Sequence, residues 1–494
     1  MQTRMQTRTN RTFFGHPPGL GTLFATELWE RFSYYGMRAI LVLYLVAPPP
    51  GAQPPGGGLG FSDGDAAAIY GSYGALVYLT PLGGGWIADR LIGARWAVLC
   101  GGGIIAAGHF CMAVGLAPAF WCGLLLIALG TGLLKPNISR MVGALYDGQP
   151  QTRRDAGFTI FYMGINLGAF LAPLVTGYLA ADFGWHWGFA AAGLGMTVSV
   201  ILYAAGWRSL DQAGRAPAHP ATPAERRRAL LSVGLGLAVF GAIFVLQGQG
   251  SGYSVTAVSI ALSWSILLVA AAYFWRMFHR PGLTAADRSR LRAFTRLFLA
   301  AVLFWMIYDQ AGSTLNLFAD QWTGRDLGGW VMPAAWLQSL NPILIIFFAP
   351  LFAWLWMALA NRAPSTPLKF AVALIGIGAS FLLMVPPGLA ADQGQQSALW
   401  WLCVVYLMQT WAELLLSPTG LSATTRLAPA GMGGQIMALW FLAVSVGDAI
   451  GGQVVRLFIG EGFAPLFGGF GLAALLIGLL ALLLVPGVRR LMQE

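Results

Sequence analysis

The sequence predicts an all-helical integral membrane protein. Of the 494 residues, 57% are hydrophobic and only 10% are charged, and the mean hydropathy is +0.66. A soluble protein of this length has too little interior to bury so much apolar surface. Apolar stretches of about 20 residues recur along the chain, and this length crosses a hydrocarbon core of about 30 Å at about 1.5 Å per residue. Basic residues gather in alternate loops between the stretches, as is typical of a multi-pass membrane protein.

Fourteen stretches are long and apolar enough to be membrane spans. The first is too long and too charged to be a removable signal peptide and lacks a small-residue cleavage site, so we expect a retained helix. An even number of spans places both termini on one side of the membrane. The expected spans are residues 19–46, 65–88, 96–115, 117–145, 157–180, 187–206, 229–248, 255–275, 297–318, 333–358, 368–386, 397–418, 434–458 and 464–486.

The distribution of basic residues indicates which side this is. Of 29 lysines and arginines, we place three within the membrane and two at the face opposite the termini. The remaining 24 lie on or near the face that holds both termini. By the positive-inside rule that face is the cytoplasm. The net charge of +10 then reflects membrane topology. We therefore expect membrane lipid around the chain and no nucleic-acid partner.

The spans form two groups of six, separated by an additional pair. The segments around Lys135 (LLKPNIS) and Ser417 (LLLSPTGLS) lie in the fourth and twelfth spans, which correspond once that pair is set aside. Duplicated halves with proline-interrupted polar helices are typical of secondary transporters. We expect a cytoplasmic tail at 1–18, a six-helix half at 19–206, linkers with two inserted helices at 207–296, a second six-helix half at 297–486 and a cytoplasmic tail at 487–494.

The sequence carries no visible enzyme machinery. It lacks HExxH and GxSxG motifs, and neither of its two lysines follows a glycine-rich phosphate loop. The four cysteines show no paired spacing and no metal pattern with histidine, so we expect small buried hydrophobes and no metal site. We predict no catalytic residues and no cofactor. The cysteines are Cys100, Cys111, Cys122 and Cys403.

Ionisable residues inside the spans point to a function. A charge at mid-membrane costs roughly 2.5 to 3.5 kcal/mol, so eight of them together exceed the typical stability of about 5 to 15 kcal/mol unless they are paired or hydrated. Five acids face three bases, so at least two carboxyls lack a basic partner, and desolvation favours their protonated form. This is the chemistry of proton coupling. The residues are Glu27, Glu30, Arg31, Arg38, Lys135, Asp309, Glu413 and Asp448.

A motif in the first span identifies a family. Residues 27–36 fit the pattern ExxERFxYYG, on which the chain resembles the bacterial proton-dependent oligopeptide transporters of the major facilitator superfamily. The resemblance implies that superfamily's fold, with two six-helix halves plus two inserted helices, and a bacterial inner membrane as location. The further matches are GGWIADRLIGAR at 84–95, Lys135-Pro136-Asn137, FYMGINLG at 161–168, Asn341-Pro342 and ELLLSPTG at 413–420.

The resemblance also implies a site for di- and tripeptides. The group that receives the peptide carboxylate is implied to be Arg31, Tyr35 and Lys135, assisted by Tyr78. The opposite pole, for the amino terminus, is implied to be Asn166, Asn341 and Glu413, and Trp440 is expected in an aromatic cavity wall.

Proton coupling is implied for five of the charged residues. Glu27, Glu30 and Lys135 occupy the family's coupling positions, and we expect Asp309 and Glu413 to take part. Protonating Glu27 or Glu30 would free Lys135 and Arg31 from internal pairing. The resemblance further implies that Asp309 pairs with Arg38 as an external gate between the halves, which breaks on protonation. Transport would be driven by the proton gradient, and we expect a monomer.

Several alternatives stay open from the residues alone. Asn166 and Asn341 could join helices only, Asp448 could be a packing or water-bound group, and His109 is best interpreted as a hydrogen-bonded interior residue. Within the same fold the substrate could be nitrate, modified amino acids or peptide-like drugs. Outside the class of transporters, the competing functions are an ion channel and a peptide receptor that does not transport.

Overall fold

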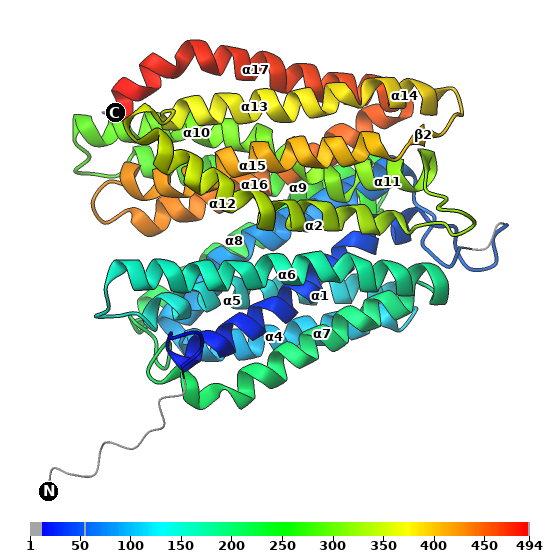
Figure 1. Cartoon of the computed structure of the whole chain (residues 1–494). Helices are drawn as coiled ribbons and strands as arrows, with labels where there is room; N and C mark the ends of the chain where they lie inside the picture. Colours follow the sequence, from blue (N-terminus) through cyan, green and yellow to red (C-terminus); the bar gives the residue numbers. More distant parts are fainter. Residues whose placement is uncertain (1–11, 54–55, 493–494) are drawn as a thin grey trace, which may run out of the picture.

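The computed structural model describes residues 12–53 and 56–492, nearly all of them in long helices (Figure 1). Within these ranges, eleven helical stretches are long and apolar enough to cross a membrane. Three more long stretches, α1 (Pro18–Val46), α2 (Asp63–Leu79) followed by α3 (Pro81–Ile87), and α15 (Trp400–Leu427), complete the fourteen predicted spans. The all-helical prediction is confirmed. Most of the predicted tail at 1–18 lies outside the described residues, as do residues 493–494.

The N-half consists of α1 to α7. Helix α1 packs against α6 and α7, and α4 packs against α5 and α7. The second span is broken at Pro81, which cannot donate a backbone hydrogen bond. Next to the break, Thr80 Oγ1 donates to the carbonyl of Ala128 at 2.8 Å. The remaining helices of this half are α4 (Ala94–Ala113), α5 (Ala117–Ala144), α6 (Gln151–Phe183) and α7 (Trp185–Ala205).

The C-half consists of α10 to α17. Its first span is interrupted by the 3₁₀ segment η3 (Asp309–Gly312), which puts an aspartate at the break between two helices. The 3₁₀ segment η4 (Ala334–Ser339) leads into α12. The helices are α10 (Ala285–Tyr308), α11 (Thr314–Trp322), α12 (Leu340–Leu359), α13 (Thr366–Leu383), α14 (Val385–Asp392), α15, α16 (Gly433–Phe458) and α17 (Phe463–Met492).

The beginning of α1 and the end of α17 lie at the same end of the bundle (Figure 1). The opposite end holds α11, α14 and a short parallel pair of strands, β1 (Thr323–Gly324) with β2 (Ser397–Ala398). We call it the distal end. The two halves meet closely where α2 crosses α16. A Cβ atom added at Gly71 would lie 3.0 Å from the Cα of Gly452, so the small residues allow the two backbones to approach.

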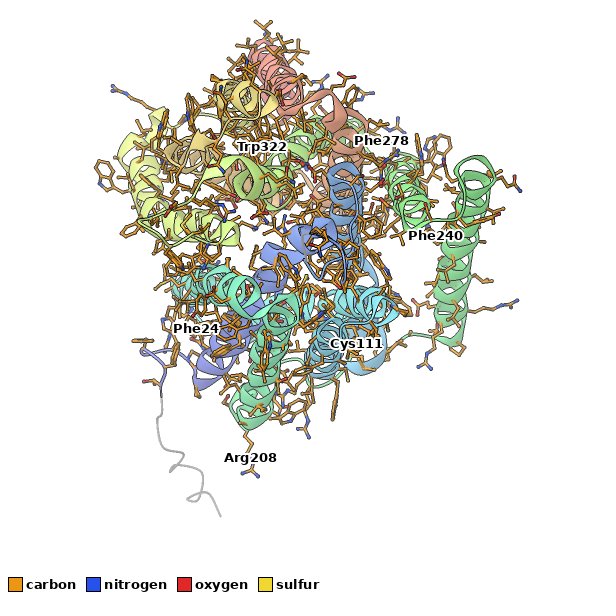
Figure 2. All side chains as sticks on the ribbon, turned by 90° about the vertical axis from the view of Figure 1, so that its right-hand side faces the viewer. Phe24, Cys111, Arg208, Phe240, Phe278 and Trp322 are labelled. Atoms are coloured by element: carbon orange, nitrogen blue, oxygen red, sulfur yellow. The ribbon has the colours of Figure 1, made fainter. Side chains whose placement is uncertain are left out.

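The inserted pair consists of α8 (Pro223–Ser251) and α9 (Val255–Phe278). Helix α8 packs mainly against α9, and its apolar window has no buried residue. Figure 2, which looks onto the distal end, shows α8 with Phe240 at the edge of the bundle. Helix α9, by contrast, packs against both α2 and α16. It therefore contacts both halves at their crossing.

Serine side chains join α9 to both halves. Ser259 Oγ donates to the carbonyl of Ala68 at 3.0 Å, lies 2.7 Å from Ser72 Oγ, and accepts from Gln453 Nε2 at 3.0 Å. Ser263 Oγ accepts from the same Gln453 amide at 3.3 Å. These contacts connect α9 with α2 of the N-half and α16 of the C-half.

We expect Ser259→Ala to lower the free energy of unfolding by about 1 to 2 kcal/mol, because hydrogen bonds between membrane helices contribute about 0.6 kcal/mol on average and about 1.7 at most. The measurement is thermal unfolding of purified protein in detergent. Ser265→Ala is the matched control, because Ser265 bonds only to the carbonyl of Ala261 in its own helix among the hydrogen bonds of the described residues. Equal melting temperatures for the two variants would contradict the prediction.

The cysteine prediction is wrong in part. Cys100 and Cys122 are exposed on their helices, and Cys111 and Cys403 are half-buried. The surface of a membrane-spanning bundle faces lipid, which is as apolar as the interior, so a small apolar residue is not driven inward there. His109, in contrast, is fully buried with Nε2 at 2.6 Å from Ser33 Oγ, as the sequence indicated.

Candidate functional site

A cavity of about 210 Å³ lies between the two halves. This is space for on the order of ten waters or for a small peptide. The N-half contributes α1, α2 and α6 to its wall, and the C-half contributes α10, η3, η4, α12 and α15. The sequence-predicted residues in the wall are Tyr35, Arg38, Tyr78, Asn166, Asp309, Asn341 and Glu413.

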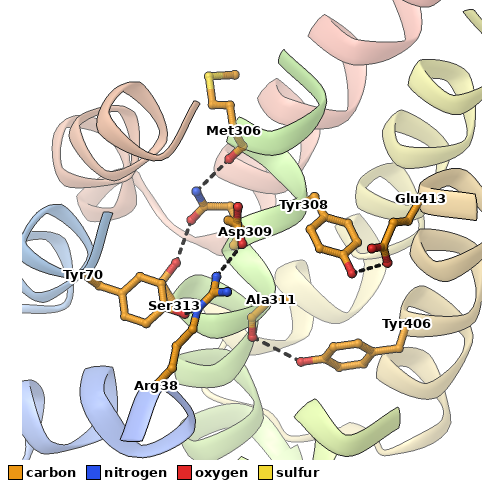
Figure 3. A network of polar contacts seen from close by, with 10 residues as sticks. Arg38, Tyr70, Met306, Tyr308, Asp309, Ala311, Ser313, Tyr406 and Glu413 are labelled. Atoms are coloured by element: carbon orange, nitrogen blue, oxygen red, sulfur yellow. Dashed lines mark hydrogen bonds and ion pairs between the residues drawn. The ribbon is translucent and has the colours of Figure 1, made fainter. Parts of the chain in front are cut away.

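Glu413 places a carboxyl in the wall of the C-half. Its Oε2 accepts from the hydroxyl of Tyr308 at 2.6 Å, a contact shown in Figure 3, and from Asn341 Nδ2 at 3.0 Å. The same amide group donates to Thr410 Oγ1 at 3.1 Å, which fixes its orientation. Among the described residues, Glu413 has no ion-pair partner. The carboxyl is thus positioned by neutral donors and is available to a cation in the cavity.

Arg31 is enclosed by carboxylates of its own helix. Its Nε lies 2.9 Å from Glu27 Oε1 and 2.6 Å from Glu30 Oε2. All three side chains are at most 4% exposed. Residues four apart share a helix face, so the α1 sequence itself places one guanidinium between two acids. This group lies behind the cavity and does not line it.

Lys135 stands apart from that group. Its Nζ is 4.0 Å from the ring centroid of Tyr78, in a cation–π contact. Within the described part of the chain it forms no ion pair, although Glu27 and Glu30 lie within electrostatic range. Because Tyr78 lines the cavity, Lys135 is one side chain away from it. Pairing of Lys135 with the glutamates is not seen here, since Arg31 is adjacent to both.

A contact between the halves lies in the wall of the cavity. Arg38 of α1 donates to Asp309 of η3 and to the hydroxyl of Tyr70 of α2 (Figure 3). The 3₁₀ turn that carries Asp309 is held by Gln310, whose Oε1 accepts from Ser313 at 2.9 Å and from Thr314 at 2.8 Å. We call Arg38, Asp309 and Tyr70 the distal gate. It brings together the two residues that the sequence paired.

Two further predicted site residues, Trp440 and Asn166, make their described contacts within their own half. Trp440 is outside the cavity wall and packs in the C-half, with its ring centroid 6.2 Å from that of Phe370. Asn166 lines the cavity, but its Nδ2 donates to the carbonyl of Tyr162 at 3.0 Å within α6. Asn341 lines the cavity and also joins α12 to α15 by its hydrogen bonds, so a role in the site and a role in joining helices are compatible for this residue.

Sequence reasoning missed five polar or aromatic residues that line the cavity. Aromatic residues in an apolar span give no signal of facing inward, because the same residues also face lipid. For Tyr308 the neighbouring Asp309 was the only available hint, and Tyr162 lies inside the FYMGINLG segment. The five residues are Tyr162, Trp305, Tyr308, Gln338 and Tyr406.

Comparison with known proteins gives consistent matches along the chain. The family model described as "POT family" (PTR2) matches residues 95–461. The chain is 42% identical to the uncharacterized transporter YclF of Bacillus subtilis (strain 168), over 97% of this chain and 96% of the relative. It is 39% identical to a di-/tripeptide transporter of Lactococcus lactis subsp. cremoris, over 99% of each. A crystal structure of a peptide transporter POT in complex with sulfate has a TM-score of 0.91 and 44% identity, over 98% of this chain and 97% of that one.

These matches extend over the whole fold. They confirm the predicted major facilitator arrangement of two six-helix halves with two inserted helices. The relatives and structural neighbours are transporters, in agreement with the prediction that the chain is not an enzyme. The chain therefore belongs to the POT family and is a multi-pass membrane transporter.

Proposed function

We propose that the protein imports di- and tripeptides together with protons by alternating access. The observation that carries this proposal is a cavity between the halves with an anionic pole at Glu413 in one wall and the cation Lys135 behind the other. The fixed features of any short peptide are its charged ends. A site with one opposite charge for each end suits such a zwitterion whatever its side chains are.

The peptide would bridge the two halves. Its ammonium group would bind Glu413, whose orientation is fixed by Tyr308 and Asn341. Its carboxylate would bind Lys135, which has no ion-pair partner within residues 12–53 and 56–492, with Tyr35 and Tyr78 alongside. Because the groups belong to different halves, bound substrate would favour a state in which the halves close over it.

The proton would act through Arg31. In this structure Glu27 and Glu30 hold the guanidinium from both sides. Protonating either carboxyl removes one of the charges that hold Arg31, which then becomes available to the substrate carboxylate. Proton binding would thus increase peptide affinity, and by linkage peptide binding would increase proton affinity. No cofactor is needed, since the proton gradient supplies the driving force.

The orientation follows from the basic residues and the helix ends. The end of the bundle that holds the start of α1 and the end of α17 would face the cytoplasm of a bacterial inner membrane. The distal end would then face outward, and the distal gate would be the external gate. We propose that the transporter works as a monomer, because each chain has its own cavity between its two halves.

Uptake by proteoliposomes tests the function. We expect labelled dialanine to accumulate when the outside is acidic, and an uncoupler to abolish the accumulation. A panel of peptides of two, three and four residues, with nitrate and single amino acids as competitors, identifies the substrate class. Competition by nitrate or amino acids but not by dipeptides would contradict a peptide substrate, and binding of peptide without accumulation would favour a receptor.

Tyr308→Phe tests the anionic pole. Removing the hydroxyl that donates to Glu413 at 2.6 Å leaves the carboxylate with Asn341 as its donor. A hydrogen bond to a charged group contributes about 1.5 kcal/mol or more, so we expect the KM for dialanine to rise about tenfold. Tyr406→Phe is the control, because Tyr406 lines the same cavity and donates to the carbonyl of Ala311. A similar KM for both variants would contradict the role of Tyr308.

A further inference from the structure

Asp448 is a buried carboxyl for which the proposed transport cycle has no role. It lies on α16, is 5% exposed, and does not line the cavity. Its Oδ1 has no hydrogen-bond partner among the described residues. A buried polar atom without a partner is expensive, so a simple packing role leaves this oxygen unexplained.

Asp448 belongs to the surroundings of the distal gate. Asp309 of η3 is within hydrogen-bonding range of its side chain, and Arg38 of α1 is within electrostatic range. The other titratable groups that face it are Tyr34 of α1 and Tyr70 of α2, with Lys135 of α5 beyond them. Asp309 Oδ1 binds Arg38, whereas Asp309 Oδ2 has no partner among the described residues.

The charges of this group do not balance unless a proton is present. Among the described residues Arg38 is the one cation in contact with Asp309, so two ionised aspartates would leave a negative charge inside the membrane at a cost of about 2.5 to 3.5 kcal/mol. Two adjacent carboxyls in such surroundings share one proton. A proton on Asp448 gives it an O–H group that donates to Asp309, so the two oxygens without partners would satisfy each other.

We propose that Asp448 is a second proton-binding carboxyl of the distal gate and that it shares one proton with Asp309 while the gate is closed. This inference rests on the proposed function, because only a transporter that alternates between states opens this gate. It adds to the Arg38–Asp309 contact a group that responds to the pH on the distal side.

The packing around Asp448 connects its proton to movement of the halves. A Cβ atom added at Gly74 of α2 would lie 2.6 Å from Asp448 Oδ2, so the carboxyl is enclosed where α2 meets α16. When the halves separate at the distal end, water reaches both aspartates and stabilises both as anions. The shared proton then leaves to the distal water, and it returns from there before the gate closes.

The sign of the pH effect follows from this exchange. The closed gate binds one more proton than the open gate, so acid stabilises the closed gate and alkali favours opening, opposite in sign to the expectation from the resemblance that protonation breaks the gate. For one proton, the ratio of open to closed molecules changes by up to about tenfold per pH unit. In Asp448→Asn, the amide can donate to Asp309 as the protonated carboxyl does, so we expect a gate that stays closed and loses this dependence.

Distance measurements across the gate test the proposal. Spin labels are attached at Asp182→Cys, at the distal end of α6, and at Gln395→Cys, after α14, both of which are exposed. The four native cysteines are first replaced by serine or alanine. In the labelled protein that keeps Asp448, we expect the fraction of open molecules to rise from pH 5 to pH 9, with the open-to-closed ratio changing by up to about tenfold per pH unit. In Asp448→Asn we expect this dependence to be lost. Glu461→Gln, an exposed carboxyl at the same end, is the control and should keep the full dependence.

Two results would overturn the proposal. One is an Asp448→Asn protein whose gate responds to pH as the control does. The other needs no variant: the infrared spectrum of protein labelled with ¹³C-aspartate should contain the C=O band of a protonated aspartate at neutral pH, and its absence would exclude the shared proton. Peptide uptake is measured in parallel. If the unmodified protein takes up no peptide, the transport function is refuted. If uptake is normal and the gate of Asp448→Asn still responds to pH as in the unmodified protein, only this inference is refuted.

Discussion

Lys135→Ala is expected to abolish concentrative uptake of dialanine, with kcat/KM reduced about 10-fold to 150-fold. Lys135 is the cation nearest the cavity that has no ion-pair partner within the described ranges, because Arg31 is held by Glu27 and Glu30. Losing a charge-assisted bond to the substrate carboxylate costs about 1.5 to 3 kcal/mol, which corresponds to about 10-fold to 150-fold at about 1.4 kcal/mol per factor of ten. The variant also loses a positive charge next to the two glutamates, which weakens coupling.

The control for this variant is the other lysine of the chain. Lys369 on α13 also lies over an aromatic ring, with Nζ 4.1 Å from the centroid of Trp356, and it is outside the cavity wall. Lys369→Ala therefore removes the same chemical group from a similar contact, and we expect its uptake to be unchanged. Proteoliposomes with an inward proton gradient and labelled dialanine provide the measurement. Normal concentration of peptide by Lys135→Ala would refute both the binding role and the coupling role.

The spans were predictable because each one depends on local composition. A stretch of about 20 apolar residues has to cross the membrane wherever it occurs, and the described helices match all fourteen predicted stretches. Local details that depend on neighbours were not predictable. The 3₁₀ break at Asp309 is stabilised by Gln310 with Ser313 and Thr314, and nothing in the hydropathy of this span indicates it.

The site residues divide in the same way. Glu413 and Asp309 were found because a carboxyl in an apolar span is expensive and so has a reason to be there. Tyr308 was not found, since a tyrosine in a span is inexpensive and gives no such signal, although it donates to Glu413 at 2.6 Å. Trp440 shows the reverse error of inference, because this aromatic residue was expected in the cavity wall and instead packs against Phe370.

Charge alone also could not predict which cation each acid binds. Five acids and three bases leave many pairings, and the resemblance implied that both Arg31 and Lys135 pair with the glutamates. Among the described residues the glutamates form ion pairs with Arg31 and not with Lys135, because Arg31 follows Glu27 by four residues and Glu30 by one. Asp448 could not be assigned from the sequence at all, since its proximity to Asp309 exists only once α16 lies beside α2 and η3.

Glu30→Gln is expected to abolish proton-driven accumulation while peptide exchange persists. Glu30 lies 2.6 Å from Arg31 and is 1% exposed, so its charge matters more to Arg31 than that of a surface carboxyl. Glutamine imitates the protonated side chain permanently, so the site can bind peptide but can no longer exchange the proton. We expect accumulation under a pH gradient to fall at least about 100-fold, because it requires the coupling step. Counterflow of labelled against unlabelled dialanine requires only binding and exchange, so it should stay within about threefold of normal.

The control is a glutamate that also pairs with an arginine but lies at the surface. Glu225 accepts from Arg90 at 3.2 Å, with both side chains more than one third exposed. Exposed pairs contribute little, so Glu225→Gln should transport normally in both assays. If Glu30→Gln accumulated peptide as well as Glu225→Gln does, the proton would have to enter through another carboxyl, and Glu27, 2.9 Å from the same guanidinium, would be the next to substitute. Loss of both accumulation and counterflow in Glu30→Gln would instead mean that the ionised carboxylate is needed to position Arg31 for binding, which would make Glu30 part of the peptide site rather than its proton switch.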